Sequence, residues 1–274
     1  MNNFKIIVMV LATNFMLSLQ GQNYAFPFGQ ELKQVRQTDT TAKKVFVLGV
    51  YASAVHAKWR DANGKVLVKA LAVASEPSIF WTGDESEARK IINAINIPKE
   101  LGRLEPANST FNGPSGKCLD ADFLHPLGLK RENAWLCDLV PYSCQNDSQR
   151  VALERNYDKY VEINKLQRYN MPNVPTTIAD ERIAEILAEL KQSQADTIIL
   201  LGDQPIKHFL SKFTNQYEKL SDFTEYGKPI EISIDNKKYN VIALAHPRQV
   251  AKLGKSNPKW YDLHQKWLKQ QSVK

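Results

Sequence analysis

The sequence predicts an α/β fold, a three-layer arrangement in which helices cover both faces of a central, mainly parallel β-sheet. One observation is that short apolar runs alternate along the chain with stretches of helical periodicity, the order typical of a parallel sheet. A second is that three of the runs end in loops of unusual composition, "GVYASAVH", "DLVPYS" and "AHPRQ". Ligands of open α/β sheets bind outside the carboxyl ends of the strands, so we expect these loops to converge on one cleft.

The expected strands are continuous apolar runs, as is typical of strands buried on both faces. They lie in residues 43–51, in residues 134–143 and at the start of "TIILLGDQPIKHFLSKF", where a glycine turn and a helix follow. Two hairpins accompany them. One covers "GKVLVKALAVASEP", closes at Asn63-Gly64 and is expected at an edge, and the other has its turn at Asp235-Asn236.

Two amphipathic helices are expected, over residues 84–98 and residues 176–194. The first has acidic residues in its first turn, and the second begins near Thr177 or Asp180. Residues 145–177 are polar and irregular, so they predict a long excursion over the surface.

Composition limits the class of protein without identifying a ligand. The chain has 274 residues, of which 43% are hydrophobic, enough for the core of one large or two small domains. Its net charge of +7 favours an anionic partner. Residues 252–274 hold six lysines, one acid and three large aromatic residues, which predicts a helix with a solvated face and a buried aromatic stripe. The odd number of cysteines, Cys118, Cys137 and Cys144, indicates buried thiols rather than a disulfide framework.

The N-terminus, "MNNFKIIVMVLATNFMLSLQGQ", has the length of a signal peptide but a poor cleavage site. It is too short, and too interrupted by Asn14, for a membrane span. An alternative is that translation begins at Met16. We expect residues 1–22 to be a signal-like or disordered extension, followed by one domain over residues 23–274. A cytoplasmic location is expected, with export as the alternative if the extension is a true signal peptide.

The loop "FNGPSGKCLD" is the most unusual stretch of the chain. Gly113 and Gly116 permit close backbone approaches, and Asn112 or Ser115 can cap the helix that follows. The free N–H groups at the start of a helix also attract anions. The loop therefore suits a ligand that carries phosphate, with the aromatic ring of Phe111 beside it.

Five segments together resemble the uracil-DNA glycosylase superfamily, over about residues 40–270. They are, in order, "GVYASA", "FNGPSGKCLD", "NAWLCDLVPYS", "TIILLGDQPIKHFL" and "AHPRQ". The Phe-x-Gly-Pro-Ser-Gly stretch is the most specific and is closest to the iron–sulfur branch of the superfamily. That branch needs four cluster cysteines and this chain lacks the N-terminal pair, so we expect a divergent member without cofactor or metal.

The resemblance implies roles for residues that face the base. An enzyme that acts on a base must take it out of the stack into a pocket. Phe111 would stack on that base, with Gly49 and Tyr51 lining the pocket from the first loop. Asp138 stands where the superfamily usually has an asparagine that reads the edge of the pyrimidine. His246 matches the histidine that stabilises negative charge on the departing base.

The resemblance also implies the residues that hold the DNA strand. Ser53 and Ser115 would bind phosphates beside the flipped nucleotide, and Arg248 and Gln249 would lie in the loop that probes the minor groove. Lys252, with Lys255 after it, would add the salt-dependent attraction to the DNA backbone.

Two departures from the superfamily pattern bear on activity. The first loop holds no carboxylate, although a nearby carboxylate stabilises the oxocarbenium-like state of glycosidic cleavage. Hydrolysis is therefore expected to be slow unless Asp138 or His56 takes over that role. Asp138 in place of asparagine accepts hydrogen bonds only, or donates one if protonated. It would then suit a base edge that offers an amino or imino donor.

The function that these residues predict is that of a monomeric DNA glycosylase. It would remove a damaged or deaminated base, uracil or a related one, from single- or double-stranded DNA in base-excision repair. The main alternative is a nucleic-acid-binding module on the same fold that has lost catalysis. A hydrolase of small nucleosides is a third reading, against which the lysine-rich C-terminal segment and the Arg248 loop argue.

Overall fold

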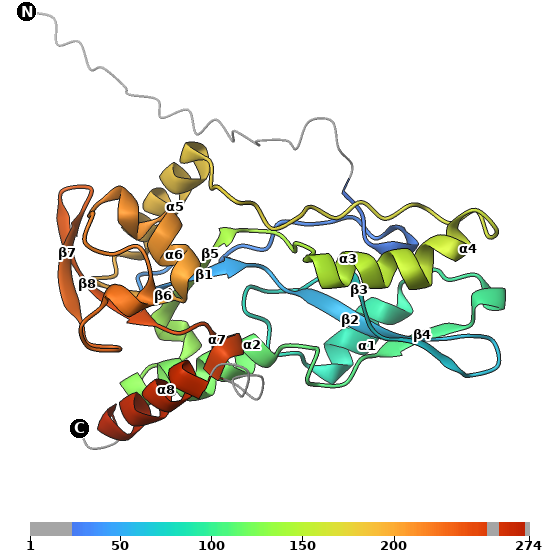
Figure 1. Ribbon diagram of the computed structural model, residues 1–274, viewed down its shortest axis with the longest axis horizontal. Coiled ribbons are helices and arrows are strands. Elements are labelled where there is room, and N and C mark those ends of the chain that lie inside the picture. The colour runs from blue at the N-terminus through green and yellow to red at the C-terminus, as the bar shows by residue number, and fades with distance from the viewer. Residues whose placement is uncertain (1–23, 251–257, 272–274) are drawn as a thin grey trace, which may run out of the picture.

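The computed structural model describes residues 24–250 and 258–271, and Figure 1 shows their arrangement. Eight strands are present among these residues: β1 Val45–Tyr51, β2 Ala54–Arg60, β3 Val66–Ser75, β4 Arg103–Pro106, β5 Ala134–Val140, β6 Thr197–Leu201, β7 Ile230–Ile234 and β8 Lys237–Leu244. The α-helices described are α1 Glu85–Asn93, α2 Pro114–Cys118, α3 Asp147–Leu153, α4 Lys159–Val161, α5 Asp180–Ser193, α6 Asp203–His208, α7 Pro247–Val250 and α8 Pro258–Gln271. Two π-helical turns, Leu119–Leu124 and Glu154–Asp158, continue α2 and α3.

The larger sheet has five strands in the order β5-β1-β6-β8-β7. Its first four strands are parallel, and only β7 runs antiparallel, in a hairpin with β8. Asp235 and Asn236 form the turn of that hairpin with φ angles of 47° and 65°, as predicted from the sequence. The carboxyl ends of the four parallel strands therefore meet at one edge, where the three unusual loops begin.

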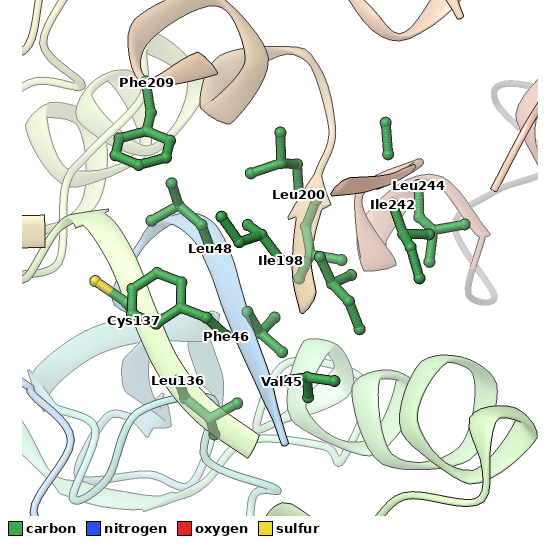
Figure 2. Packing of buried hydrophobic residues seen from close by; sticks show 14 of the residues in the cluster. Val45, Phe46, Leu48, Leu136, Cys137, Ile198, Leu200, Phe209, Ile242 and Leu244 are labelled. Atoms are coloured by element: carbon green, nitrogen blue, oxygen red, sulfur yellow. The ribbon is translucent and has the colours of Figure 1, made fainter. Parts of the chain in front are cut away.

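Helices cover the larger sheet on both sides, which confirms the predicted three-layer α/β fold. Figure 1 shows α5 and α6 on one face of the sheet and α2 and α8 on the other. The strands supply the core between these layers, and Figure 2 shows their apolar side chains packed together. Phe46, Leu48, Ile198 and Leu200 have no exposed surface. Residues two apart share one face of a strand. Val47 and Ile199, which point to the opposite face, have no exposed surface either, so both faces of β1 and β6 are buried, as their continuous apolar runs predict.

The first hairpin does not join the larger sheet, so the prediction of its place at an edge of that sheet is wrong. Instead β2 pairs with β3 on one side and with β4 on the other, in a separate three-stranded sheet. Val55, Ala57 and Trp59 lie on one face of β2 and have no exposed surface. Their burial forms a second core, which the alternating side chains of an antiparallel strand allow.

Residues 145–177 are not only an excursion over the surface, so the prediction for this segment is corrected. Leu153, Tyr157 and Val161 are buried against the small sheet, and the Tyr157 ring lies 5.2 Å from that of Phe28. The three buried residues follow one another at intervals of four, the spacing that places side chains on one face of a helix. A polar helix with a narrow apolar stripe therefore closes the second core.

The remaining predicted elements are present with adjusted ends. α1 begins after Asp84, whose carboxylate accepts a hydrogen bond from the Glu87 N–H at 2.9 Å, and it is shorter than the 84–98 segment. α5 begins at Asp180. In α8, Trp267 is buried, whereas Tyr261 is 38% exposed, so the aromatic stripe is only partly covered.

The extension predicted for residues 1–22 lies outside the described residues. Among the residues that the structure does describe, no helix is both long and apolar enough to cross a bilayer.

Candidate functional site

The centre of the candidate site is the pair Gly49 and Asp138, which lie opposite each other on β1 and β5. A Cβ atom added to Gly49 would lie 2.2 Å from Oδ1 of Asp138 and 2.6 Å from Cζ of Phe80. Glycine at this position therefore lets a carboxyl group and an aromatic ring meet over the end of β1. An acid and a flat ring at the carboxyl edge of the sheet are suited to bind a polar, planar ligand.

Asp138 is held in place through its backbone. Its carbonyl oxygen accepts a hydrogen bond from Nη2 of Arg182 at 2.6 Å, and the Leu139 carbonyl accepts one from Nε at 3.2 Å. Arg182 in turn forms ion pairs with Glu185 and Glu189. This network ties the end of β5 to α5 and leaves the Asp138 side chain free to face the site.

The environment of the Asp138 carboxyl group favours its protonated form. The residue is 3% exposed, and no hydrogen bond from the described residues reaches its side-chain oxygens. Burial raises the pKa of this carboxyl well above its usual range, and the negative charge of Glu76 raises it further. The positive charge of Arg182 opposes this rise in pKa, but its guanidinium group bonds to backbone oxygens and to the carboxylates of Glu185 and Glu189.

Glu76 is a site residue that the sequence analysis missed. It follows β3 directly, is 4% exposed, and accepts hydrogen bonds from the N–H groups of Ser53 at 3.1 Å and Trp81 at 3.2 Å. Burial raises the pKa of this carboxyl to about 7, although the backbone N–H groups favour its charged form. The resemblance identified Asp138, but no motif of the resemblance includes Glu76. The available signal for Glu76 was an acid at the end of an apolar run, after "ALAVAS".

The aromatic ring that the structure places at Gly49 is that of Phe80, a residue that the sequence analysis did not name. Phe111, the expected stacking residue, is 43% exposed, whereas Phe80 is 7% exposed and lies at Gly49. Asn112 does not cap α2 as expected. Its side chain accepts from the His56 N–H at 2.8 Å and donates to the His56 carbonyl at 2.9 Å. The Ser115 side chain does not cap α2 either, because that helix begins at Gly113 without a side-chain cap.

The glycine-rich loop packs against the segment that carries Phe80. A Cβ on Gly116 would lie 2.2 Å from the Phe80 carbonyl oxygen, and one on Gly113 would lie 2.0 Å from the Thr82 carbonyl carbon. Nη2 of Arg131 bridges the two segments, donating to the carbonyls of Phe80 at 2.6 Å and Gly116 at 3.2 Å. The glycines thus permit a backbone-to-backbone contact that fixes Phe80, which gives the loop a structural role.

His246 follows β8, two strands away from Gly49 in the sheet. Its Nδ1 accepts a hydrogen bond from the Arg248 N–H at 3.1 Å, so the proton of the neutral ring is on Nε2. Burial lowers the pKa of His246 to about 4, and the charge of Arg248 adds to this effect. Oε1 of Gln249 accepts from the His246 backbone N–H at 3.1 Å, which orients the loop. His246 is therefore a neutral hydrogen-bond donor.

Tyr51 lies between the two sides of the site, at the end of β1. Burial raises the pKa of its phenol, the positive charge of Arg248 opposes that shift, and the charge of Asp138 adds to it. Both residues are therefore close enough to act on Tyr51. Ser53 is tied down by its backbone, because its N–H bonds to Glu76 and its carbonyl accepts from the hydroxyl of Ser143.

The candidates for strand binding are only partly described. Arg248 is exposed, Ser115 is half-buried, and the side chain of Gln249 is used within its own loop. Lys252 and Lys255 lie outside the described residues. The site therefore brings Gly49, Tyr51, Asp138, His246 and Arg248 to one edge of the sheet, and it adds Glu76 and Phe80 to them.

The cysteines do not form a common ligand set. The Cys118 thiol bonds to Asp122 at 3.3 Å, that of Cys137 accepts from Arg182 at 3.3 Å, and that of Cys144 bonds to the Tyr142 carbonyl at 3.8 Å. The four-thiolate cluster of the iron–sulfur branch has no fitting donors among them. In the described residues, no group of three His, Cys, Asp or Glu side chains is arranged to hold a metal.

The fold and the site define a class of protein: an α/β domain with an acid, an aromatic ring and a neutral histidine at the carboxyl ends of parallel strands. Residues 80–269, more than half of the chain, match the family described as the Uracil DNA glycosylase superfamily. The chain belongs to this superfamily, as the sequence motifs predicted. A search among curated proteins gives no match. The matched region starts at Phe80, so it includes Asp138 and His246 but not Gly49.

Proposed function

We propose that the protein is a monomeric DNA glycosylase that hydrolyses the N-glycosidic bond of a damaged or deaminated base, uracil or a related one. Its superfamily acts on DNA. The observation that carries the proposal is the placement of Asp138 and His246 at the carboxyl ends of β5 and β8, the outer members of four adjacent parallel strands. A base-reading group and a charge-stabilising group would then face a bound base from opposite sides.

The reaction needs the pocket to hold a base that has left the duplex. The ring of Phe80 supplies a flat surface beside Asp138, and Phe111 is exposed and able to contact the nucleotide from outside. The polar edge of the base would meet the Asp138 carboxyl group. Because Gly49 has no side chain, the Asp138 carboxyl group and the Phe80 ring can both lie over β1.

His246 would act as the bond breaks. The electron pair of the bond between C1′ and the base nitrogen moves onto the base, and the sugar becomes an oxocarbenium-like cation. The Nε2–H of the neutral imidazole donates a hydrogen bond to the oxygen on which the negative charge develops. Water then adds its oxygen to C1′, and its proton balances the charge of the released base.

DNA binding would depend on charge outside the pocket. Arg248 is exposed beside His246, and Lys252 follows it in the sequence. Cationic contacts to phosphate weaken as salt increases, because binding releases counterions from the DNA. Affinity for any DNA should therefore fall steeply with salt, whichever base the pocket accepts.

The proposal is tested by excision from labelled oligonucleotides that carry uracil, hypoxanthine, xanthine or an oxidised pyrimidine, in single and double strands. We expect alkali-labile product with at least one base, and a decrease of about 10²–10³-fold for His246→Ala, the usual effect of removing such a donor. Asp138→Ala should also remove activity, and His125→Ala, at an exposed histidine, serves as the matched control.

The alternative of a binding module without catalysis makes the opposite prediction. It would give no product on any of these bases while DNA binding remained sensitive to salt. That result would refute the glycosylase function and leave the binding function standing.

A further inference from the structure

Two carboxyl groups are buried at this site, and only one of them belongs to a motif of the superfamily resemblance. Asp138 is 3% exposed and Glu76 is 4% exposed, and the charge of Glu76 acts on Asp138. One segment reaches both groups, because the Phe80 ring and Oδ1 of Asp138 both approach Gly49, and the next residue, Trp81, donates its N–H to Glu76. Two such groups cannot both be ionised without a large cost in free energy, so one retains a proton.

The hydrogen bonds identify which group carries the charge. Both oxygens of Glu76 accept from backbone N–H groups, of Ser53 and Trp81, and an N–H can only donate. The Asp138 side chain receives no hydrogen bond from the described residues, and Arg182 donates to its backbone oxygen instead. Glu76 is therefore stabilised as the carboxylate and Asp138 as the acid.

The other groups around Asp138 do not reverse this assignment. The titratable and charged groups that interact with it besides Glu76 are Arg182, Glu189, Cys137, Cys144 and Tyr51. The charge of Glu189 favours the protonated form of Asp138, and only Arg182 opposes it. Burial keeps the two thiols and the phenol in their neutral forms.

We propose that Asp138 meets the base as a carboxylic acid, which offers one O–H donor and one carbonyl acceptor, while Glu76 keeps the negative charge. This inference rests on the glycosylase function proposed above. A neutral acid presents the same pair of groups as an asparagine amide, whereas a carboxylate presents acceptors only. The matching base edge has a carbonyl oxygen next to a ring N–H, as in uracil, hypoxanthine and xanthine. A carboxylate would instead place an acceptor against that carbonyl oxygen.

Glu76 is a positioning residue in this scheme, since it acts through Asp138. Removing its negative charge would let Asp138 lose its proton at a lower pH. Recognition of the base should therefore fail on the alkaline side, at a pH that Glu76 determines. Asparagine at position 138 would keep a donor and an acceptor at every pH.

The test measures how much more tightly the protein binds an oligonucleotide that contains 2′-fluoro-2′-deoxyuridine, whose fluorine resists cleavage, than an undamaged oligonucleotide of the same sequence. Fluorescence anisotropy gives this ratio from pH 5 to pH 8.5, below the range in which the ring N–H of uracil itself ionises. For the parent protein we expect a plateau and then a decrease of about tenfold per pH unit, as for the loss of one proton. Glu76→Gln should shift the midpoint downward by about one pH unit or more. Asp138→Asn should make the ratio independent of pH.

Glu100→Gln, at an exposed glutamate, is the matched control and should leave the midpoint in place. A ratio that rises with pH in the parent would overturn the inference, and so would loss of the preference at every pH in Asp138→Asn. An unchanged midpoint in folded Glu76→Gln would also overturn it.

Excision with a preference that does not depend on pH would refute the protonated form of Asp138 alone. Absence of both excision and preference in the parent would refute the glycosylase function, and the role of the protonated Asp138 with it.

Discussion

Substitution of Gly49 by alanine gives the sharpest test of the site geometry. The new methyl group would lie 2.2 Å from Oδ1 of Asp138 and 2.6 Å from Cζ of Phe80, where ordinary contact begins at 3.4 Å. The carboxyl group and the ring must each move by about 1 Å, in a core that is already filled. Overpacking of this kind costs about 1–3 kcal/mol. A misplacement of about 1 Å at the reacting centre lowers rates by about 100-fold.

The assay combines urea unfolding with single-turnover excision of the base that the parent protein removes. Gly128→Ala is the control, because its φ of 68° strains alanine while no atom lies within 4 Å of the added Cβ. We expect the control to lose about 1–2 kcal/mol of stability and to keep its excision rate. Parental stability and parental rate in Gly49→Ala would refute the close approach of Asp138 and Phe80 to Gly49.

Three further predictions follow from contacts around the site. Gln249→Ala removes the acceptor for the backbone N–H of His246, a hydrogen bond of about 1 kcal/mol, so the excision rate should fall about fivefold. The affinity for DNA should stay at the parental value. Equal losses in rate and affinity would assign Gln249 to DNA binding instead. Arg131→Ala leaves the carbonyls of Phe80 and Gly116 without their donor and should lower the free energy of unfolding by about 2 kcal/mol in urea titrations; an unchanged urea midpoint would contradict the bridge. Histidine in the unfolded chain takes up its proton near pH 6.5, whereas folded His246 does so near pH 4. The free energy of unfolding should therefore fall as the pH drops from 6.5 to 4, and it should fall less in His246→Gln. Identical pH dependence in the two proteins would contradict burial of this ring.

The sequence predicted the larger sheet because its strands carry their signal locally. β1, β5 and β6 are apolar runs buried on both faces, and β8 becomes such a run in its second half. An ordinary amphipathic helix does not show this pattern. Asp138 and His246 follow from the same signal, since polar residues that end such runs lie at the carboxyl edge of the sheet.

The small sheet and the residues it supplies could not be predicted in the same way. β2 is separated from β1 by only two residues, and whether it continues the larger sheet depends on partners far away in the sequence. One of those partners, Tyr157, lies in the segment interpreted as a surface loop. The positions of Glu76 and Phe80 depend on the path that the chain takes after β3, the second strand of that hairpin. The local sequence pattern alone therefore did not place them at the site. The interval of four between Leu153, Tyr157 and Val161 was the available signal.

The neighbours Phe80 and Trp81 belong to different cores, Phe80 to that of the larger sheet and Trp81 to that of the small one. A single peptide bond thus joins two packing units that can open with different free energies. Shortening Trp59, deep in the small core, would loosen the segment with Glu76 and Phe80 and leave the strands with Asp138 and His246 intact. Under the proposed function, excision activity and the global fold should therefore be separable. Amide hydrogen exchange in the small sheet would report the free energy of opening the segment with Glu76 and Phe80. Exchange in the larger sheet would report the free energy of global unfolding.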